Sequence, residues 1–530
     1  MTQSVPANFD EVVTLGELIR YNAAVRPSKE ALVFEGRSTS YGEFDGLSNQ
    51  VANGLLHEGL AFGARVAFMG KTSDLFFQVV FGCAKSGTVL VGINWRLTQP
   101  EVAYILNDCK AEILFVGPEF WGLAGSLRSE VPNLKRIVAM GSGHPQWQRF
   151  EDWRDHFSDT APTVAISAGD VAVQMYTSGT TGHPKGVQLA HRSFFAFRPF
   201  PPADDMTFEN WTEQDVSLVA MPSYHIGGVG WGIAGLRAGA RNIIIREFDA
   251  GAVLDIIHRF HVSKLFLVPA AMQVVLKHPA ARTTDYSSLE YITYAASPIP
   301  IDLLREALGV FKCGFVQLYG MTETTGGATY LPPADHDIQG NERMKSAGKA
   351  FPGVSIKIVD IAGREVAPRT MGEICIKSPA NMLGYWNLPV ETAEALKEGY
   401  VHSGDIGFLD EDGYVYVLDR AKDMIVSGAE NISPVEVENA LLAHPAVSEA
   451  AVIGVPDDLW GEAVKAIVVA KPNQSVAADE LIAFARQRIA GYKLPKSVDF
   501  VSSLPRNPTG KVLKRELRKP YWAGHARSIV

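Results

Sequence analysis

Short β-prone runs alternate with amphipathic helical stretches over the first three hundred residues of this 530-residue chain. Residues 31–34 (ALVF) and 66–69 (VAFM) are each followed by a stretch with helical spacing, and similar runs recur at 242–247, 264–269 and 291–297. Strands that alternate with helices along a chain build parallel sheets with helices on both faces. The pattern therefore predicts an α/β fold whose ligands bind at the carboxyl ends of the strands, where the loops gather.

Helix-start signals follow the early β-prone runs. Ser40 and Glu43 have the spacing of a capping box, in which each side chain binds the backbone N–H group of the other residue. A helix is also expected over 73–86. Pro100 favours a further helix that opens near Gln99, because proline is well tolerated in a first helical turn.

The texture of the sequence changes near residue 345. β-prone runs separated by turns rich in Gly and Asp predict a β-rich subdomain over 345–419. The stretch 433–436 (SPVE) combines an N-cap serine, a proline at N1 and a glutamate at N3, so a helix is expected over 434–443. We expect a large N-terminal domain over 1–419 and a small α+β C-terminal domain over 424–530.

Composition and charge exclude several classes of protein. With 47% hydrophobic and 20% charged residues, the chain can bury a large core, which excludes disordered and fibrous proteins. A formal net charge of −9 argues against a protein that coats nucleic acid. The N-terminus lacks the features of a secretory signal. The apolar stretch 218–236 contains a proline and five glycines, so we expect it to be buried in protein rather than in lipid.

The four cysteines predict a reducing environment. Cys83, Cys109, Cys313 and Cys375 stand far apart, with no CxxC motif and no histidine clustered beside them in the sequence. This spacing favours neither a zinc site nor a disulfide framework. We therefore expect a cytoplasmic protein without integral membrane association.

The run from Tyr176 to Gly186 (YTSGTTGHPKG) predicts a phosphate-binding loop. Its glycines let the backbone turn amide groups toward an anion, its four serine and threonine hydroxyl groups can donate to phosphate oxygens, and Lys185 adds a positive charge. The run is not a Walker A loop, because that motif ends in Gly-Lys-Ser/Thr, whereas Pro184 precedes the lysine here.

This run resembles the phosphate loop of the adenylate-forming superfamily, which groups acyl-CoA synthetases, adenylation domains of peptide synthetases and luciferases. Five further motifs stand in the family's order: QLYGMTE at 317–323, SGD at 403–405, DR at 419–420, GAEN at 428–431 and PTGK at 508–511. Together they make the chain most similar to fatty acyl-CoA synthetases. The resemblance implies ATP and Mg²⁺ as cofactors and CoA as co-substrate, and it leaves a homodimer open.

The resemblance also implies a nucleotide site. The implied ATP- or AMP-binding residues are Thr177, Ser178, Gly179, Thr180, Thr181, Gly182, Lys185, Ala296, Ser297, Gln317, Leu318, Tyr319, Gly320, Met321, Thr322, Asp405, Arg420 and Lys511. The chemistry of several of them fits: Gln317 can accept from the adenine amino group, and Tyr319 can stack on the ring. Thr322 can donate to the α-phosphate, and Glu323 offers a hard oxygen to Mg²⁺. Asp405 can accept hydrogen bonds from the ribose hydroxyls, and Arg420 can donate to them or to phosphate.

The implied reaction needs no nucleophile from the enzyme. A carboxylate attacks the α-phosphorus of ATP, pyrophosphate leaves, and a thiol then attacks the acyl-adenylate. Because two anions must meet, preplaced cations are required. Lys511 is implied to act as such a cation, and the expected catalytic set is Lys511, Lys185, Thr322, Glu323 and His225.

The family rotates its small domain between the two half-reactions. Residues 420–423 match the family's hinge, with Lys422 at the pivot. Gly428, Ala429, Glu430 and Asn431 match its thioester-step loop. The basic residues after Lys511 are expected to form a solvated face rather than a lipid anchor; they are Lys514, Arg515, Arg518 and Lys519.

The segment 221–228 (MPSYHIGG) resembles the one that flanks the family's acyl cavity. The implied acyl-binding residues are His225, Gly228, Trp231 and Gly320. We expect the glycines between 227 and 235 to leave room for an apolar chain, with Trp231 as the floor. Since no carboxylate or arginine stands between Met221 and Gly235, a mainly apolar monocarboxylic acid is predicted. A medium- or long-chain fatty acid is the first choice, and an aryl or alicyclic acid is the alternative.

Three other functions are alternatives. An adenylation enzyme could load a carrier protein, although the chain ends soon after Lys511, so no fused carrier domain is expected, and no Phe-Asp pair near 225–235 could hold an amino group. Nothing separately supports a luciferase-like oxidase. A silent nucleotide-binding scaffold should lose Lys185, Glu323 or Lys511, and all three are present. Small departures from the family, such as Ala-Ser-Pro at 296–298 where Gly-Ala-Pro is common, affect the substrate prediction more than the activity prediction.

Overall fold

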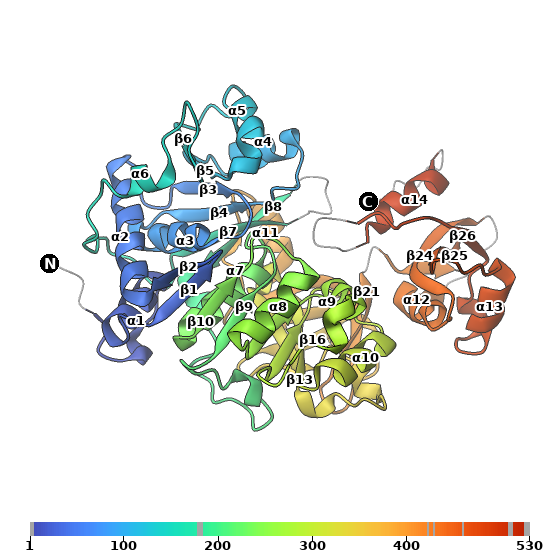
Figure 1. Cartoon of the computed structure of the whole chain (residues 1–530). Helices are drawn as coiled ribbons and strands as arrows, with labels where there is room; N and C mark the ends of the chain where they lie inside the picture. The colour runs from blue at the N-terminus through green and yellow to red at the C-terminus, as the bar shows by residue number, and fades with distance from the viewer. Residues whose placement is uncertain are drawn as a thin grey trace.

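The computed structural model describes residues 5–177, 184–420, 423–427, 430–457, 461–506 and 512–523. Two large sheets form the bulk of the molecule (Figure 1). In spatial order, the seven-stranded sheet consists of β18 (Gly384–Tyr385), β8 (Lys185–Ala190), β7 (Val171–Thr177), β4 (Val89–Ile93), β3 (Arg65–Met69), β5 (Ile113–Val116) and β6 (Arg136–Ala139). The nine-stranded sheet consists of β15 (Lys349–Ala350), β14 (Gly326–Leu331), β13 (Gly314–Met321), β12 (Tyr291–Tyr294), β11 (Lys264–Leu267), β9 (Val216–Val219), β10 (Arg241–Ile244), β1 (Glu30–Phe34) and β2 (Arg37–Ser40).

Both sheets are parallel in the middle; the nine-stranded sheet is antiparallel at both edges, whereas the seven-stranded sheet is antiparallel at one edge and parallel at β6. In the nine-stranded sheet the pairs from β1 through β10, β9, β11 and β12 to β13 are parallel, whereas β2, β14 and β15 join antiparallel. In the seven-stranded sheet β8 and β18 are the antiparallel additions. The predicted α/β fold with parallel-rich sheets is confirmed.

Helices fill three layers around the two sheets. A core shared by both sheets packs against α1 (Leu15–Val25), α2 (Tyr41–His57), α3 (Asp74–Ser86) and α7 (Ile226–Ala238), with α6 (Phe150–Arg154) beside α2. Figure 1 shows α3 between strands β3 and β4 and strands β1 and β2. The outer face of the seven-stranded sheet packs against α4 (Gln99–Asp108) and α5 (Trp121–Leu127). The outer face of the nine-stranded sheet packs against α8 (Ala250–Phe260), α9 (Pro269–Lys277) and α10 (Ile301–Phe311).

The early helices begin where the sequence predicts. Ser40 caps α2 through a reciprocal capping box with Glu43, because the Ser40 hydroxyl accepts from the Glu43 N–H group and the Glu43 carboxylate accepts from the Ser40 N–H group. Ser73 caps α3, and α4 carries its proline in the first turn. Local hydrogen bonding therefore starts these helices.

Two smaller sheets follow in the chain. The first comprises β16 (Ser355–Val359), β17 (Gly372–Lys377), β20 (Tyr400–Leu409) and β19 (Leu396–Lys397), with β21 (Val415–Arg420) also paired to β20 and α11 (Pro389–Ala395) beside it. The second comprises β23 (Glu430–Ile432), β22 (Ile425–Ser427), β25 (Gly461–Ala470) and β24 (Val447–Asp457), with β26 (Ser497–Phe500) paired to β25. It packs with α12 (Pro434–Leu442), α13 (Ala478–Arg486) and α14 (Lys514–Trp522) at one side of the molecule (Figure 1).

The helix predicted over 434–443 is present as α12, with Ser433 at the N-cap position and Pro434 in the first turn. The Ser433 hydroxyl does not bond to that turn, because it donates to the Leu418 carbonyl at 2.8 Å and so ties α12 to β21. The residues after Lys511 are not a fully solvated basic face. Arg518 is buried and donates to Asp423 Oδ1 at 2.8 Å and to the Asp423 carbonyl, and Lys514 pairs with Glu438 at 2.9 Å. The apolar face of α14 packs against β24, which places these cations inside the fold.

The apolar stretch 218–236 ends β9 and forms most of α7. This helix has 13 residues, and its buried positions pack in the core shared by the two large sheets. Among the helices of the described ranges, none combines the length and the hydropathy of a membrane span.

Candidate active site

The predicted phosphate loop connects two adjacent strands of the seven-stranded sheet. Thr177 ends β7 and Lys185 begins β8, and their Cα atoms are partners in the antiparallel register. Five predicted nucleotide-binding residues of the loop lie outside the described residues; they are Ser178, Gly179, Thr180, Thr181 and Gly182. The register nevertheless places Lys185 beside Thr177, the last residue of β7.

Strand β18, two hundred residues later in the chain, is the edge strand next to β8. Strand β18 pairs with β8, so that Tyr385 lies opposite Val187. The ring of Tyr385 lies 5.1 Å from Lys185 Nζ, within range of a cation–π contact. Its hydroxyl donates to Glu323 Oε1 at 3.0 Å. One tyrosine thus joins the predicted phosphate-binding lysine to the predicted metal-binding carboxylate.

Glu323 is held in place by its backbone as well as by its carboxylate. It lies in a short 3₁₀ helix, Thr322–Thr324, directly after β13, and only 6% of the residue is exposed. Its carbonyl accepts from the Met382 N–H group at 2.8 Å. A fixed, nearly buried carboxylate is a suitable hard-oxygen ligand for Mg²⁺.

Tyr319 and Asp405 form the second cluster. The Tyr319 hydroxyl donates to Asp405 Oδ2 at 2.8 Å, and Asp405 is 6% exposed. Arg420 is the register partner of Asp405 across β20 and β21, but its side chain lies outside the described part of the structure. Because Tyr319 stands four residues before Glu323, the two clusters meet at the end of β13.

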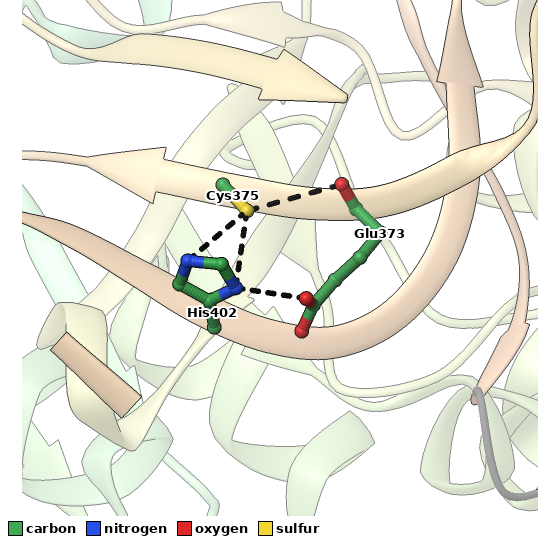
Figure 2. A group of neighbouring side chains, drawn as sticks. All are labelled: Glu373, Cys375 and His402. Carbon is green, nitrogen blue, oxygen red and sulfur yellow. Dashed lines mark hydrogen bonds and ion pairs between the residues drawn. The ribbon is translucent and has the colours of Figure 1, made fainter. Parts of the chain in front are cut away.

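The part of β20 that presents Asp405 is supported from β17, where the register between the two strands shifts. Gly404 adopts a φ of +68°, a conformation that glycine tolerates without strain, and its N–H group donates to Glu373 Oε1 at 3.0 Å. The other oxygen of Glu373 accepts from His402 Nδ1 at 2.8 Å (Figure 2). Ser403 completes the support, since its hydroxyl donates to the Ile374 carbonyl and accepts from the Asp405 N–H group.

Cys375 lies against the same histidine ring, and the donor atoms of Glu373, Cys375 and His402 all lie within 4.8 Å of one another, a spacing that could hold a metal ion. The Cys375 sulfur lies 3.5 Å from Nδ1 and 3.8 Å from Nε2 of His402 (Figure 2). A zinc ion bound by the ring would lie about 2.0 Å from one nitrogen, on the lone-pair axis of that nitrogen. A sulfur bound to the same ion would then lie much farther from the second ring nitrogen than from the first. Burial raises the pKa of the Cys375 thiol to about 12, so the thiol is protonated at neutral pH. The group therefore supports this part of β20 rather than a metal, and its members are too far apart in the sequence for local spacing to reveal it.

The carboxyl ends of β12 and β13 carry the residues predicted to contact adenine. Tyr294 and Gln317 are register partners in the parallel pair, and the Tyr294 hydroxyl lies 3.2 Å from the Gln317 side-chain amide. Ala296, two residues after Tyr294, is exposed and has a φ of +77°. Left-handed backbone is costly for a residue with a Cβ atom. Ser297 follows in the same loop.

The remaining predicted residues of β13 are in place along the strand. Leu318 and Met321 are partly buried, as is Thr322, which opens the 3₁₀ helix. Gly320 sits opposite Gly327, and a Cβ atom at Gly320 would lie 1.8 Å from the Gly326 carbonyl oxygen. Glycine is therefore required there by the close approach of β14.

His225 and Trp231 flank the first turns of α7. His225 is the N-cap residue, and burial together with the nearby Arg96 lowers its pKa to about 4, so the ring is neutral at neutral pH. Trp231 packs edge-on against Trp211 at 5.0 Å and lies near Phe266 at 5.7 Å. Neither His225 Nε2 nor Trp231 Nε1 has a hydrogen-bond partner among the described residues.

The prediction that the α7 glycines leave volume is wrong at most of their positions. A Cβ atom at Gly228 would lie 2.1 Å from the Pro222 carbonyl oxygen. The corresponding distances are 2.4 Å from Gly232 to the Phe77 ring and 2.2 Å from Gly235 to Asn242 Oδ1. These glycines let α7 pack closely against its neighbours, so Gly228 adds no space for a substrate.

Several C-terminal predictions fall outside the described residues. They are Lys422, Gly428, Ala429 and Lys511, together with the side chains of Glu430 and Asn431. The backbone of Glu430 and Asn431 forms β23, paired antiparallel with β22.

Two protein-family models match most of this chain, including the motifs described above. The model of the AMP-binding enzyme family matches residues 19–386, and that of the AMP-binding enzyme C-terminal domain matches residues 436–511. The chain belongs to the AMP-binding enzyme family. This AMP-binding enzyme is thus an adenylate-forming ligase near the fatty acyl-CoA synthetases, as the sequence motifs predicted.

Three similar proteins are informative about this AMP-binding enzyme. It is 42% identical to the fatty acid–[acyl-carrier-protein] ligase ScoC of Streptomyces coeruleorubidus, over 98% of each chain. It is 34% identical to the long-chain-fatty-acid–CoA ligase FadD13 of Mycobacterium tuberculosis, over 96% of this chain and 99% of the relative. Among solved structures, the anthranilate CoA ligase AuaEII in complex with anthranoyl-AMP matches with a TM-score of 0.87 and 29% identity, over 97% of this chain and 98% of the other.

Sequence reasoning missed Tyr385, Glu373 and His402. Tyr385 stands 62 residues after Glu323, and Glu373 stands 31 residues before Gly404. No local spacing signals these pairs, because they form only when β18 joins β8 and β17 joins β20.

Proposed function

We propose that this enzyme activates a mainly apolar carboxylic acid with ATP and transfers the acyl group to the thiol of CoA. In the first step a carboxylate oxygen bonds to the α-phosphorus and the bond to the β-phosphate breaks, which releases pyrophosphate. In the second step the thiol sulfur bonds to the acyl carbon, AMP leaves, and the thiol proton is lost. The observation that carries this proposal is the Lys185–Tyr385–Glu323 chain beside the Tyr319–Asp405 pair, at the end of one strand.

The two clusters suit the two ends of a nucleotide. Asp405 offers carboxylate oxygens for ribose hydroxyls, while Tyr319 orients that carboxylate through its own hydroxyl. Lys185 supplies positive charge where the phosphates would lie, and Thr322 a hydroxyl donor. Glu323 would hold Mg²⁺, which supplies charge neutralisation to the leaving pyrophosphate.

The acid is proposed to bind beside the first turns of α7. His225 is neutral and its Nε2 atom is buried without a partner among the described residues, so an Nε2–H group can donate to a substrate carboxylate. The aromatic rings of Trp211, Trp231 and Phe266 offer an apolar surface nearby. A medium- or long-chain fatty acid fits this surface, and an aryl acid is the alternative, since AuaEII acts on an aromatic acid.

We further propose that the unit from residue 424 onward rotates about residues 420–423 between the two steps. Lys422 would be the pivot, Lys511 would serve adenylation, and the loop 428–431 would serve thioester formation. The buried Arg518–Asp423 pair supports this proposal, because it fixes α14 to Asp423, the last residue of the hinge. Rotation would then carry the whole small unit rather than only its first strand.

A second candidate acceptor is the thiol of a carrier protein. The relative with 42% identity over 98% of both chains is a fatty acid–[acyl-carrier-protein] ligase, and this similarity favours the carrier. The adenylation step would be the same in both cases, so only the acceptor distinguishes them.

The test has two stages. ATP–pyrophosphate exchange is measured against acetate, C6 to C18 fatty acids, benzoate-type acids, a dicarboxylate and an amino acid, and product formation is then followed with CoA or with a phosphopantetheinylated carrier protein. Exchange with apolar monocarboxylates supports the proposal, and each added methylene should raise kcat/KM by up to about fourfold until the chain meets the pocket floor. Best exchange with acetate, the amino acid or the dicarboxylate would contradict the acid proposed.

Matched variants separate site effects from folding effects. Glu323→Gln should lower exchange by about 10² or more, whereas Glu306→Gln, an exposed carboxylate paired with Arg282 on the surface, should leave it unchanged. Product formation with the carrier protein but not with CoA would show that the acceptor is the carrier-protein thiol and not the CoA thiol.

A further inference from the structure

A hydrogen-bonded chain of three side chains lies at the carboxyl ends of β12 and β13. The hydroxyl of Tyr294 lies 3.0 Å from His336 Nε2 and 3.2 Å from the side-chain amide of Gln317. Tyr294 is fully buried, and His336 directly follows the 3₁₀ helix Pro333–Asp335. The chain thus links a loop after β14 to a residue predicted to contact adenine.

The Pro332 carbonyl determines which nitrogen of His336 carries the proton. His336 Nδ1 lies 2.9 Å from that carbonyl oxygen, which can only accept a hydrogen bond, so Nδ1 must be the donor. Burial lowers the pKa of His336 to about 4, which leaves a single ring proton at neutral pH. His336 Nε2 therefore presents a lone pair to Tyr294.

The direction of the remaining bonds follows from this tautomer. The Tyr294 hydroxyl has one proton, and burial raises its pKa far above the neutral range, so it donates that proton to His336 Nε2. The Tyr294 oxygen can then only accept from Gln317. Although Oε1 occupies the nearer position, the two ends of a side-chain amide are interchangeable in shape, and the hydrogen-bond network decides their assignment. The NH₂ group of Gln317 therefore faces Tyr294, and its carbonyl oxygen faces away.

We propose that His336 and Tyr294 are positioning residues that fix the carbonyl oxygen of Gln317 toward the purine and thereby select a 6-amino purine over a 6-oxo purine. The inference rests on the proposed function, because it takes the base to lie beside Gln317. The alternation along β13 supports that placement, since Gln317 and Tyr319 share a face of the strand and Tyr319 binds Asp405. An adenine amino group would donate to the fixed oxygen, whereas the 6-oxo group of a hypoxanthine would meet it acceptor to acceptor.

Inosine triphosphate is the appropriate probe, because it carries the 6-oxo group without the additional 2-amino group of guanine. The ratio of kcat/KM for ATP to that for ITP is measured by pyrophosphate exchange. Tyr294→Phe frees the Gln317 amide to turn over, so it should lower this ratio about tenfold, mainly through the two KM values. His336→Leu removes the acceptor, after which Tyr294 can donate to the Gln317 oxygen and turn the NH₂ group toward the base. This variant should lower the ratio at least as far.

Tyr286→Phe is the matched control. Its hydroxyl also donates a single hydrogen bond, to the Ala281 carbonyl at 2.6 Å, and it packs under α10 away from the predicted adenine edge. This variant should keep the wild-type ratio. Thermal unfolding of all three variants shows whether each is folded, and His336→Leu carries the test if Tyr294→Phe is not.

Two results would overturn the inference. An unchanged ATP-to-ITP ratio, with both activities lowered equally in Tyr294→Phe and His336→Leu, would show that the chain only stabilises the fold. A ratio that rises in either variant would reverse the assigned amide orientation. If the wild type shows no exchange with any acid, the proposed function fails separately, and calorimetric binding of ATP and ITP by the same proteins still measures the base preference.

Discussion

The hydroxyl of Tyr385 donates to Glu323 Oε1 at 3.0 Å, while the face of the same ring lies 5.1 Å from Lys185 Nζ. Three elements meet in this contact: the edge strand β18, the first residue of β8 and the 3₁₀ helix after β13. The two large sheets are therefore connected at the point where the phosphates of a nucleotide are proposed to bind.

Loss of the Tyr385 hydroxyl should weaken the apparent affinity for Mg²⁺ more than it lowers the stability of the fold. Tyr385→Phe keeps the ring beside Lys185 but removes one donor to the nearly buried Glu323 carboxylate. A hydrogen bond to a charged group contributes about 1.5–3 kcal/mol, so we expect a roughly tenfold or greater rise in the Mg²⁺ concentration needed for half-maximal exchange. Titration of Mg²⁺ at fixed ATP measures this, and equal half-maximal concentrations in both proteins would contradict the role.

Glu373 should control the affinity for nucleotide through the backbone of β20 at Gly404. Glu373→Ala releases the Gly404 N–H group and His402, so the part of β20 that presents Asp405 is less ordered and the KM for ATP should rise about tenfold. Glu373→Gln keeps an acceptor for Gly404 and should retain most of the affinity. Cys375→Ser, which changes only the sulfur contact with His402, should change KM less than twofold, and a tenfold effect of Cys375→Ser would show that the thiol does more than pack.

Ala296→Gly should stabilise the protein. The φ of +77° at Ala296 costs about 1–2 kcal/mol for a residue with a Cβ atom, and glycine avoids that cost although it loses more entropy on folding. We expect a net gain of about 0.5–1 kcal/mol in the free energy of unfolding, measured as the shift of the urea midpoint. Ala295→Gly, at a position without positive φ, should be neutral or destabilising, and a gain of the same size there would contradict the strain at Ala296.

The α7 glycines should respond in opposite directions to substitution by alanine. At Gly230 a Cβ atom would lie 3.4 Å from Ile226, an ordinary contact, so Gly230→Ala should stabilise the helix by about 1 kcal/mol. At Gly232 it would lie 2.4 Å from the Phe77 ring, so Gly232→Ala should destabilise by about 1–3 kcal/mol. Urea unfolding of the pair measures the difference, and similar shifts would mean that α7 is packed less closely than described.

Acid should destabilise the fold through three histidines whose pKa values are lowered by desolvation. Burial lowers the pKa of His191, His225 and His336 to about 4 each, below the ordinary value of 6.5. Between pH 6.5 and 4 the unfolded chain binds protons that the folded chain does not, so this stability is fully present above pH 6.5 and falls as the pH drops toward 4. His191→Asn keeps an acceptor for the Leu15 N–H group and removes one titrating ring. Its unfolding temperature should therefore fall less steeply over this range, and an unchanged slope would contradict the assignment.

Local chemistry made much of the molecule predictable from its sequence. The capping box of Ser40 and Glu43 involves residues three positions apart, so its signal is complete within one helical turn. The alternation of β-prone runs with helices predicted the parallel sheets, because each run and each helix has its own local residue pattern. The order of the short motifs around Lys185, Glu323 and Asp405 identified the family, since each motif is contiguous in the chain.

The tertiary structure alone decided which of these residues touch one another and what supports them. Tyr385 reaches Glu323 because β18 adds to the edge of a sheet formed two hundred residues earlier, and Glu373 reaches Gly404 because β17 lies beside β20. The sequence likewise predicted free volume at Gly228, but the Pro222 carbonyl occupies the position where a side chain would begin. Strand register and close packing depend on all neighbours at once, so no spacing along the chain encodes these contacts.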